Sequence, residues 1–181
     1  MKIEVPISRA NSLVNSGNVI LVTSCYKDKS SIITIAWHTP VSIKPAVLGI
    51  SVGKERFSAE LIKKSGEFIV NIPAWNLLEQ MLYCGTYSGR DVNKFKETKL
   101  TPQKAEKLIN TPKIKECIGS LECSVIDTRE IGDHIMFFGV VQYADADEEL
   151  FKDGIWDTKK AELIYHLGGN FFMKSSEFKK A

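Results

Sequence analysis

The fold of this chain is decided by residues 30–73, which read SSIITIAWHTPVSIKPAVLGISVGKERFSAELIKKSGEFIVNIP. The apolar runs at 31–37, 46–52 and 67–72 predict three strands, because β-branched residues suit the pleated surface of a sheet. Residues 58–65 predict a short helix, with Gly66 as its stop signal. Such brief connections leave no room for repeated helical crossovers, and the stretch therefore favours antiparallel strands.

The rest of the chain continues this pattern. Further strands are predicted at 18–26, 118–128 and 135–143, and helices at 8–16 and 77–84. The segment that contains Pro40 and Pro45 is expected to lack regular structure, because proline removes a backbone donor. Residues 85–104 are expected to form a long irregular loop, a kind of loop that is often functional. With no repeat or linker visible, we predict one domain over residues 1–181, mainly β, built as an antiparallel barrel with a few helices.

Composition narrows the function classes. The 181 residues are 44% hydrophobic and 25% charged, and the net charge of +2 gives no general attraction toward nucleic acid. The four cysteines form no Cys-x-x-Cys pair, which disfavours zinc and thioredoxin-like sites, and no metal site is predicted. The first residues lack the apolar stretch of a signal peptide, and no apolar run approaches the roughly 18 residues that span a membrane. We therefore expect a cytoplasmic protein without membrane partners.

A candidate anion site lies between the second predicted strand and the helix, in residues 53–58. Lys54, Arg56 and Ser58 gather there at a helix N-terminus, whose free N–H groups and dipole favour a phosphate. Arg56 is able to hold two phosphate oxygens at once, and Trp37 on a nearby strand offers a wall for a flat ring. The pattern indicates a nucleotide-like cofactor. Three alternatives stay open: both cations as solvated loop charges, Ser58 as an ordinary helix N-cap, and Trp37 as a core residue.

The amino-acid sequences of several segments resemble those of a known family. Residues 31–37, 48–58 and 65–73 are similar to the flavin reductase-like family, and more narrowly to the flavoredoxin branch of FMN-binding split barrels. Residues 88–95, 132–134 and 139–141 match the same family in the same order. The resemblance extends over residues 20–172. It implies a split β-barrel homodimer, of antiparallel Greek-key type, with one FMN per subunit near the dimer interface.

The resemblance also implies which residues of this chain bind FMN. Four residues fall where the family lines the isoalloxazine ring: Thr34, Ile35, Ala36 and Trp37. Four more fall where it holds the ribityl phosphate: Ser51, Lys54, Arg56 and Ser58.

Two further residues are implied to take part in catalysis near the flavin. Lys94 matches a lysine beside the ring, where a cation would stabilise the charge of the reduced form. His134 matches the histidine of a Gly-Asp-His turn and would hydrogen-bond the ring edge or guide a donor. The alternatives are a surface lysine and a hairpin-turn histidine. His166 and Phe171 lie in a tail segment expected to cover the ring, and Ser31 stands where the family often has asparagine.

The implied activity is an FMN-dependent oxidoreductase that passes electrons from NAD(P)H, or from a protein donor, to a small acceptor such as free flavin or ferric iron. The alternative is a flavoredoxin-type carrier that moves electrons between protein partners without turnover of small substrates. A third option is a barrel of the same architecture that binds another ligand, as its heme-binding or pyridoxamine-oxidase-like relatives do. No Gly-x-Gly-x-x-Gly motif is present, and NAD(P)H would therefore dock transiently on the exposed flavin.

Overall fold

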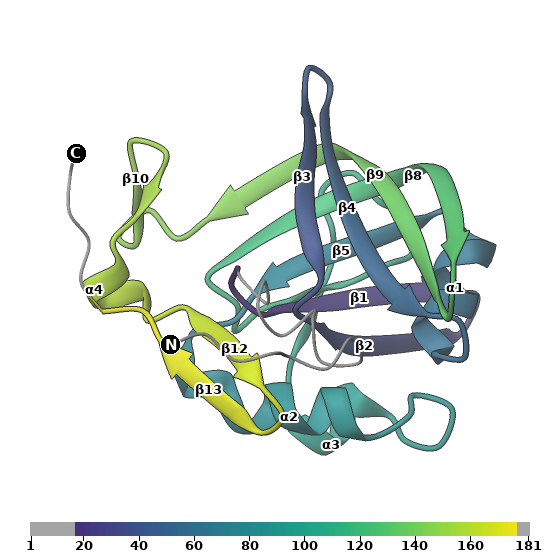
Figure 1. Ribbon diagram of the computed structural model, residues 1–181, viewed down its shortest axis with the longest axis horizontal. Coiled ribbons are helices and arrows are strands. Elements are labelled where there is room, and N and C mark those ends of the chain that lie inside the picture. The colour runs from purple at the N-terminus through teal and green to yellow at the C-terminus, as the bar shows by residue number, and fades with distance from the viewer. Residues whose placement is uncertain (1–16, 177–181) are drawn as a thin grey trace, which may run out of the picture.

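The computed structural model describes residues 17–176, and an antiparallel sheet of seven strands dominates them (Figure 1). The order of the strands across the sheet is β2-β1-β5-β8-β9-β4-β3. They are β1 (Ile20–Tyr26), β2 (Lys29–Ile35), β3 (His38–Ile43), β4 (Ala46–Gly53), β5 (Glu67–Ile72), β8 (Gly119–Ile131) and β9 (His134–Ala146). The sheet curls around its own apolar face, and the predicted mainly β barrel is confirmed.

Short helices and hairpins surround this sheet. The helical segments are α1 (Phe57–Ser65), the 3-10 turn η2 (Trp75–Leu77), α2 (Leu78–Thr86), α3 (Lys94–Thr98) and α4 (Thr158–Ala161). Three small hairpins pair β6 (Pro102–Gln103) with β7 (Lys113–Ile114), β10 (Phe151–Lys152) with β11 (Ile155–Trp156), and β12 (Ile164–Gly168) with β13 (Phe171–Lys174).

Two of the three predicted helices are found in the structure. The two predicted at 58–65 and 77–84 are confirmed as α1 and α2, and the predicted irregular segment 85–104 contains the short helix α3. The helix predicted at 8–16 lies outside the described residues. Within residues 17–176, none of the helices has the length and apolar character needed to cross a membrane.

The prediction of an irregular segment around Pro40 is wrong. Residues His38–Ile43 form β3, which pairs with β4 from His38↔Ile50 to Ile43↔Ala46 and has a register shift between Pro40 and Ser42. β3 tolerates proline because it lies at one edge of the sheet, where a missing N–H need not interrupt a ladder. The β3–β4 hairpin extends well beyond the body of the sheet (Figure 1).

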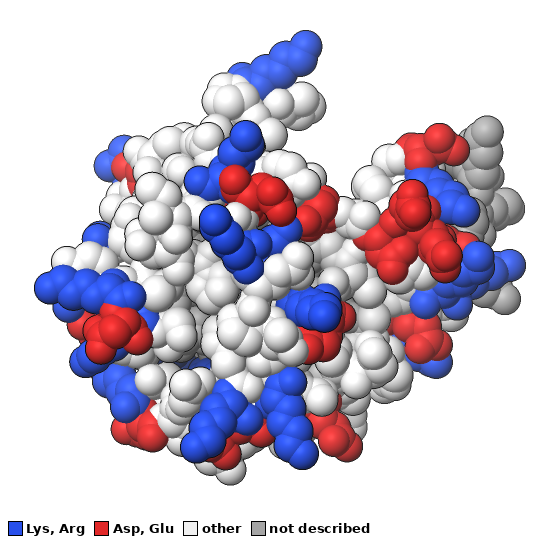
Figure 2. All heavy atoms as spheres, turned by 180° about the vertical axis from the view of Figure 1, so that it is seen from behind, with Lys and Arg blue, Asp and Glu red and all other residues white. Residues whose placement is uncertain are grey.

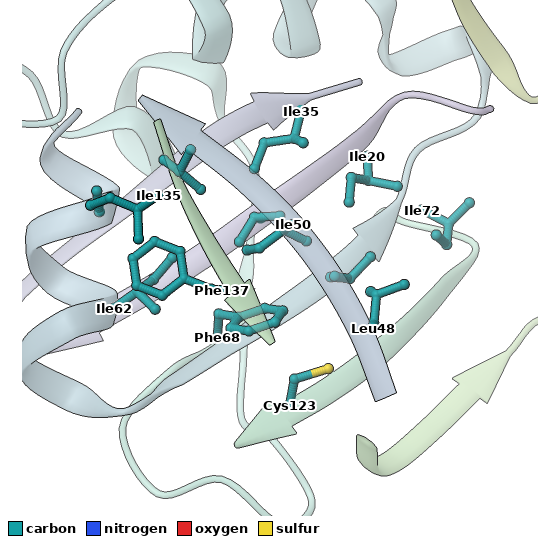
Figure 3. Packing of buried hydrophobic residues seen from close by; sticks show 14 of the residues in the cluster. Ile20, Ile35, Leu48, Ile50, Ile62, Phe68, Ile72, Cys123, Ile135 and Phe137 are labelled. Atoms are coloured by element: carbon teal, nitrogen blue, oxygen red, sulfur yellow. The ribbon is translucent and has the colours of Figure 1, made fainter. Parts of the chain in front are cut away.

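The barrel interior is filled by apolar side chains from both halves of the sheet and from α1 (Figure 3). Ile50 of β4, Phe68 of β5 and Phe137 of β9 are fully buried there, and Ile62 of α1 closes one end. Gly139 lies against this packing: a Cβ at its position would sit 2.6 Å from Cζ of Phe68. Glycine is therefore required where β9 crosses the ring of Phe68.

A second apolar cluster covers the outer face of β1 and β2. It joins Leu21 of β1 and Ile32 of β2 to Met81 and Cys84 of α2 and to Phe95 of α3. Both helices lie along these strands in Figure 1. The packing fixes α2 beside β2, and this neighbourhood forms one wall of the site described below.

The charged surface is mixed in sign. On the face seen in Figure 2, Lys and Arg side chains are interspersed with Asp and Glu side chains. Among the described residues, the exposed ion pairs include Lys63 with Glu130 at 2.8 Å and Lys64 with Glu60 at 2.7 Å. Exposed pairs of this kind contribute little to stability, about 0–1 kcal/mol each. This face therefore presents no extended field of one sign that would steer a polyanion.

Candidate functional site

A cleft of about 550 Å³ opens beside β2, within the usual size range of small-molecule sites. Its walls come from the end of β2, from β4, from α2, from the start of β9 and from the turn of the β12–β13 hairpin. The expected ring residues all line it: Thr34, Ile35, Ala36 and Trp37. The cleft therefore brings together segments that are far apart in the sequence.

The free edge of β2 faces this cleft. β2 is the last strand of the sheet, and the carbonyl of Ile32 points away from β1 toward the Lys94 ammonium, 2.7 Å away. Peptide groups that face the same edge alternate along an antiparallel strand. Within β2, the peptide group of Thr34 therefore also faces the free edge, where it offers hydrogen bonds to a ligand. The Thr34 hydroxyl is already used, since it donates to the carbonyl of Met81 at 2.6 Å.

Trp37 and His134 form the opposite wall. Their ring centroids lie 5.1 Å apart with the planes tilted by 37°, and the side chain of Trp37 is 44% exposed. The alternative of a core tryptophan is therefore wrong. Nδ1 of His134 lies 2.7 Å from the carboxylate of Asp133, and this hydrogen bond lowers the pKa of that carboxyl group. Held in this way, His134 presents its other ring nitrogen, Nε2, to the region of Gly53 in the cleft.

A smaller pocket of about 190 Å³ adjoins the cleft, since Ile33, Arg56 and Gly85 line both hollows. Its remaining wall is rich in hydroxyl groups and includes Ser31 and Ser58. The hydroxyl of Ser31 is buried, with the residue only 2% exposed, and makes no hydrogen bond within the described part of the chain. An unpaired buried hydroxyl is costly, and one that lines a pocket indicates that a polar ligand completes it.

Lys94 lies in this smaller pocket and not in the larger cleft. Its buried ammonium donates to the carbonyl of Ile32 at 2.7 Å and to that of Cys84 at 2.6 Å. Burial lowers the pKa of Lys94 to about 8, and the nearby Arg56 charge acts in the same direction. The alternative of a solvated surface lysine is therefore wrong. Because an ammonium has three N–H donors, one remains for a ligand.

The predicted phosphate residues separate in space. Arg56 lines both hollows and, among residues 17–176, has neither an ion pair nor a side-chain hydrogen bond. Ser51 lines the cleft, and Ser58 lines the smaller pocket. Lys54 lines neither hollow and instead pairs with Glu130 at 3.2 Å.

The alternative of Ser58 as an ordinary helix N-cap is wrong. Helix α1 begins at Phe57, and Arg56 occupies the N-cap position without a side-chain cap. The amide groups at the start of this helix are therefore not engaged by a capping side chain. They adjoin the smaller pocket, because Arg56, Phe57 and Ser58 all line it.

The tail segment covers one side of the cleft, as expected, but with a different phenylalanine. His166 lines the cleft together with Phe172, whose ring centroid lies 5.0 Å from that of His166. Phe171 is 74% exposed and does not line the cleft. Successive residues of a strand point to opposite faces of the strand. Phe172 therefore faces the cleft, and its neighbour Phe171 faces away from it.

Sequence reasoning missed the contribution of α2. Met81, Leu82, Gly85 and Thr86 line the cleft, and Gly85 lies so close to β2 that a Cβ there would sit 3.3 Å from Cβ of Thr34. The predicted helix ended at residue 84, so Gly85 was assigned to the irregular segment, whereas α2 continues through it to Thr86. Ser88 and Gly89, which line the smaller pocket, fall in the long segment that was expected to be functional.

Comparison with known proteins identifies relatives of this chain. The sequence profile described as "Flavin reductase like domain" matches residues 13–170. An uncharacterised protein of Archaeoglobus fulgidus is 36% identical over 151 residues, which are 83% of this chain and 84% of that protein.

Among solved structures, the flavoredoxin of Methanosarcina acetivorans superimposes with a TM-score of 0.88 at 28% identity and covers 100% of this chain and 95% of its own. The FMN-binding protein of Thermus thermophilus shares the fold, with a TM-score of 0.86 at 19% identity over 100% of this chain and 98% of its own. With the profile match over most of its length, this chain belongs to the flavin reductase-like family.

Proposed function

We propose that the chain binds FMN, with the isoalloxazine ring in the 550 Å³ cleft and the phosphate in the 190 Å³ pocket. The observation that carries this proposal is the junction of the two hollows at Arg56. One hollow has an aromatic wall and a free strand edge, and the other has an unpaired buried hydroxyl at Ser31. A ligand with a flat ring at one end and an anion at the other suits both.

The smaller pocket supports a phosphate through several kinds of donor. Within residues 17–176, Arg56 has no competing carboxylate, and a charge-assisted contact to a phosphate is about twice as strong as a neutral one. Ser31 and Ser58 add hydroxyl groups, and the uncapped start of α1 adds backbone amides and the positive end of its dipole. Lys94 supplies its third N–H. Lys54 was expected from the sequence to bind the phosphate, but it pairs with Glu130 and is not included among the proposed phosphate donors.

The larger cleft supports a ring through its edge and its walls. The peptide group of Thr34 suits the polar rim of a flavin, and Trp37 provides a flat apolar surface. Bound FMN would supply the redox chemistry, while the chain supplies binding, orientation and electrostatics. His134 is placed to hold or move a proton at Nε2 beside the ring. Lys94 contributes a positive charge at the edge of β2, where its ammonium donates to the carbonyl of Ile32.

On this basis the protein is an oxidoreductase that takes electrons from NAD(P)H or from a protein donor. It passes them through FMN to a small acceptor such as free flavin or ferric iron. The second candidate is an electron carrier between proteins, which the 28% identity to a flavoredoxin favours. We place the activity in the cytoplasm, since all four cysteines, which lie within the described residues, are free thiols.

We also propose that two copies of the chain associate. The support is the β3–β4 hairpin, which projects from the sheet with Val41 48% and Ile43 88% exposed (Figure 1). Exposed apolar side chains on a projecting edge are a common feature of interfaces between subunits. Light scattering on the purified protein should give twice the mass of one chain, and Ile43→Asp should shift the mass toward one chain.

The reductase and the carrier are separated by mixing FMN-loaded protein with NADH, and separately with NADPH, under anaerobic conditions. Rapid bleaching of the visible flavin bands by either nucleotide supports the reductase. Bands that persist with both nucleotides but bleach with a reduced protein donor support the carrier. The variant His134→Asn should slow the bleaching while it retains FMN, whereas Lys63→Ala, on the outer side of α1, should match the unmodified chain.

A further inference from the structure

The segment 87–93 forms the outer wall of the smaller pocket. Tyr87, Ser88 and Gly89 line it from the side opposite β2. Gly89 presses directly on the pocket floor: a Cβ at this position would sit 2.4 Å from the hydroxyl oxygen of Ser31 and 3.1 Å from Cδ1 of Phe57. The segment therefore covers the hydroxyl of Ser31 on this side of the pocket.

One residue, Arg90, fastens this wall to helix α1. Its Nη1 donates to the carbonyl of Glu55 at 2.9 Å, and its Nη2 lies 3.2 Å from the carboxylate of Glu60. Its guanidinium carbon is 5.2 Å from the centroid of the Phe57 ring, within the range of a cation–π contact. All three partners lie on or next to the start of α1, on either side of the phosphate candidate Arg56.

The carboxylate of Glu60 is positioned for its contact with Arg90 by a second cation. Lys64, one helical turn further along α1, binds its other oxygen at 2.7 Å. The hydrogen bonds from Lys64 and Arg90 keep the pKa of Glu60 below its ordinary value. Arg90 itself lines neither the cleft nor the smaller pocket. Its contacts therefore act on the wall and not on the ligand.

We propose that Arg90 is a positioning residue: it latches segment 87–93 to α1 and thereby sets how fast a bound phosphate group leaves the smaller pocket. This inference rests on the proposed function, because FMN is the ligand whose phosphate it retains. Opening the wall breaks all three Arg90 contacts, while the contacts to the phosphate are unchanged in the closed state. The latch therefore slows release more than it changes how the ligand is held.

The test is the rate of FMN release after rapid dilution, followed by the recovery of free FMN fluorescence. Arg90→Ala should release FMN about tenfold faster, the effect expected from one hydrogen bond and one exposed ion pair together. Arg90→Lys should lie between, since a lysine keeps the charge but loses the planar fork. Glu60→Gln removes one partner and should accelerate release about threefold, since an exposed ion pair is weak. Lys63→Ala, also on α1, is the control and should be unchanged.

Riboflavin, which lacks the phosphate, separates a latch from general loosening. Its release should be nearly the same from Arg90→Ala and from the unmodified chain. Equal acceleration for riboflavin and FMN, or unchanged FMN release from Arg90→Ala, would overturn the latch while the proposed cofactor stands. An unmodified chain that binds no FMN would overturn the proposed function, and the latch with it.

Discussion

Replacing Arg56 with alanine should weaken FMN binding with little effect on folding. Arg56 lines both hollows, and within the described residues its guanidinium has no ion pair or hydrogen bond to lose. The backbone that carries it is fixed independently, since its amide donates to the carbonyl of Gly53 at 3.0 Å and its carbonyl accepts from Ala59 at 3.0 Å. The variant should therefore fold like the unmodified chain.

The size of the effect follows from the phosphate contact. A hydrogen bond to a charged group contributes about 1.5–3 kcal/mol. Since each 1.4 kcal/mol changes an equilibrium tenfold, the dissociation constant of FMN should rise by about 10- to 150-fold. The other donors of the smaller pocket, Ser31 and Ser58 among them, remain in the variant. Binding should therefore be weakened and not abolished.

The assay is a fluorescence titration of the flavin-free protein with FMN and, in parallel, with riboflavin. We expect Arg56→Ala to lose affinity for FMN but to bind riboflavin nearly as well as the unmodified chain does, because only FMN carries the phosphate. Lys54→Ala is the matched control, since Lys54 pairs with Glu130 outside both hollows and its loss should change FMN affinity less than about twofold. Unchanged FMN affinity in Arg56→Ala would refute the phosphate assignment.

Three other changes have expected outcomes. FMN affinity should fall as the pH rises through about 8, because a bound phosphate favours the protonated form of Lys94, and titrations of Lys94→Met should lose this fall. Ser31→Ala should weaken FMN but not riboflavin in the same titrations, since the unpaired hydroxyl lies in the smaller pocket. Gly139→Ala should lower the free energy of unfolding, measured with urea, by about 1–3 kcal/mol, because its Cβ would overlap the ring of Phe68.

The strands were the most predictable part of the fold. Their runs of β-branched residues favour extended structure locally, and these runs do form strands of the sheet. Among the seven strands of the main sheet, the exception was β3, where Pro40 argued against a strand. The position of a strand at the edge of a sheet decides whether proline is tolerated, and this position depends on the order of all seven strands. The local effect of proline on its neighbours in the sequence does not reveal where in the sheet a strand will lie.

The site was predictable where its residues lie on one element and not where separate elements meet. Trp37 and the end of β2 line the cleft as expected. Lys54 and Arg56 look equivalent in sequence, but only Lys54 meets the carboxylate of Glu130, which the β8–β9 hairpin brings to it. The α2 wall was missed because apolar helix residues facing a ligand have the same spacing as residues facing a core.

The central claim is that the two joined hollows hold FMN. It is tested most directly by the visible absorption spectrum of the purified protein after incubation with excess FMN and gel filtration. The account predicts flavin bands that co-elute with the protein at one FMN per chain and fall strongly in Arg56→Ala. A protein that elutes colourless, with all the added FMN in the small-molecule fractions, would contradict the account.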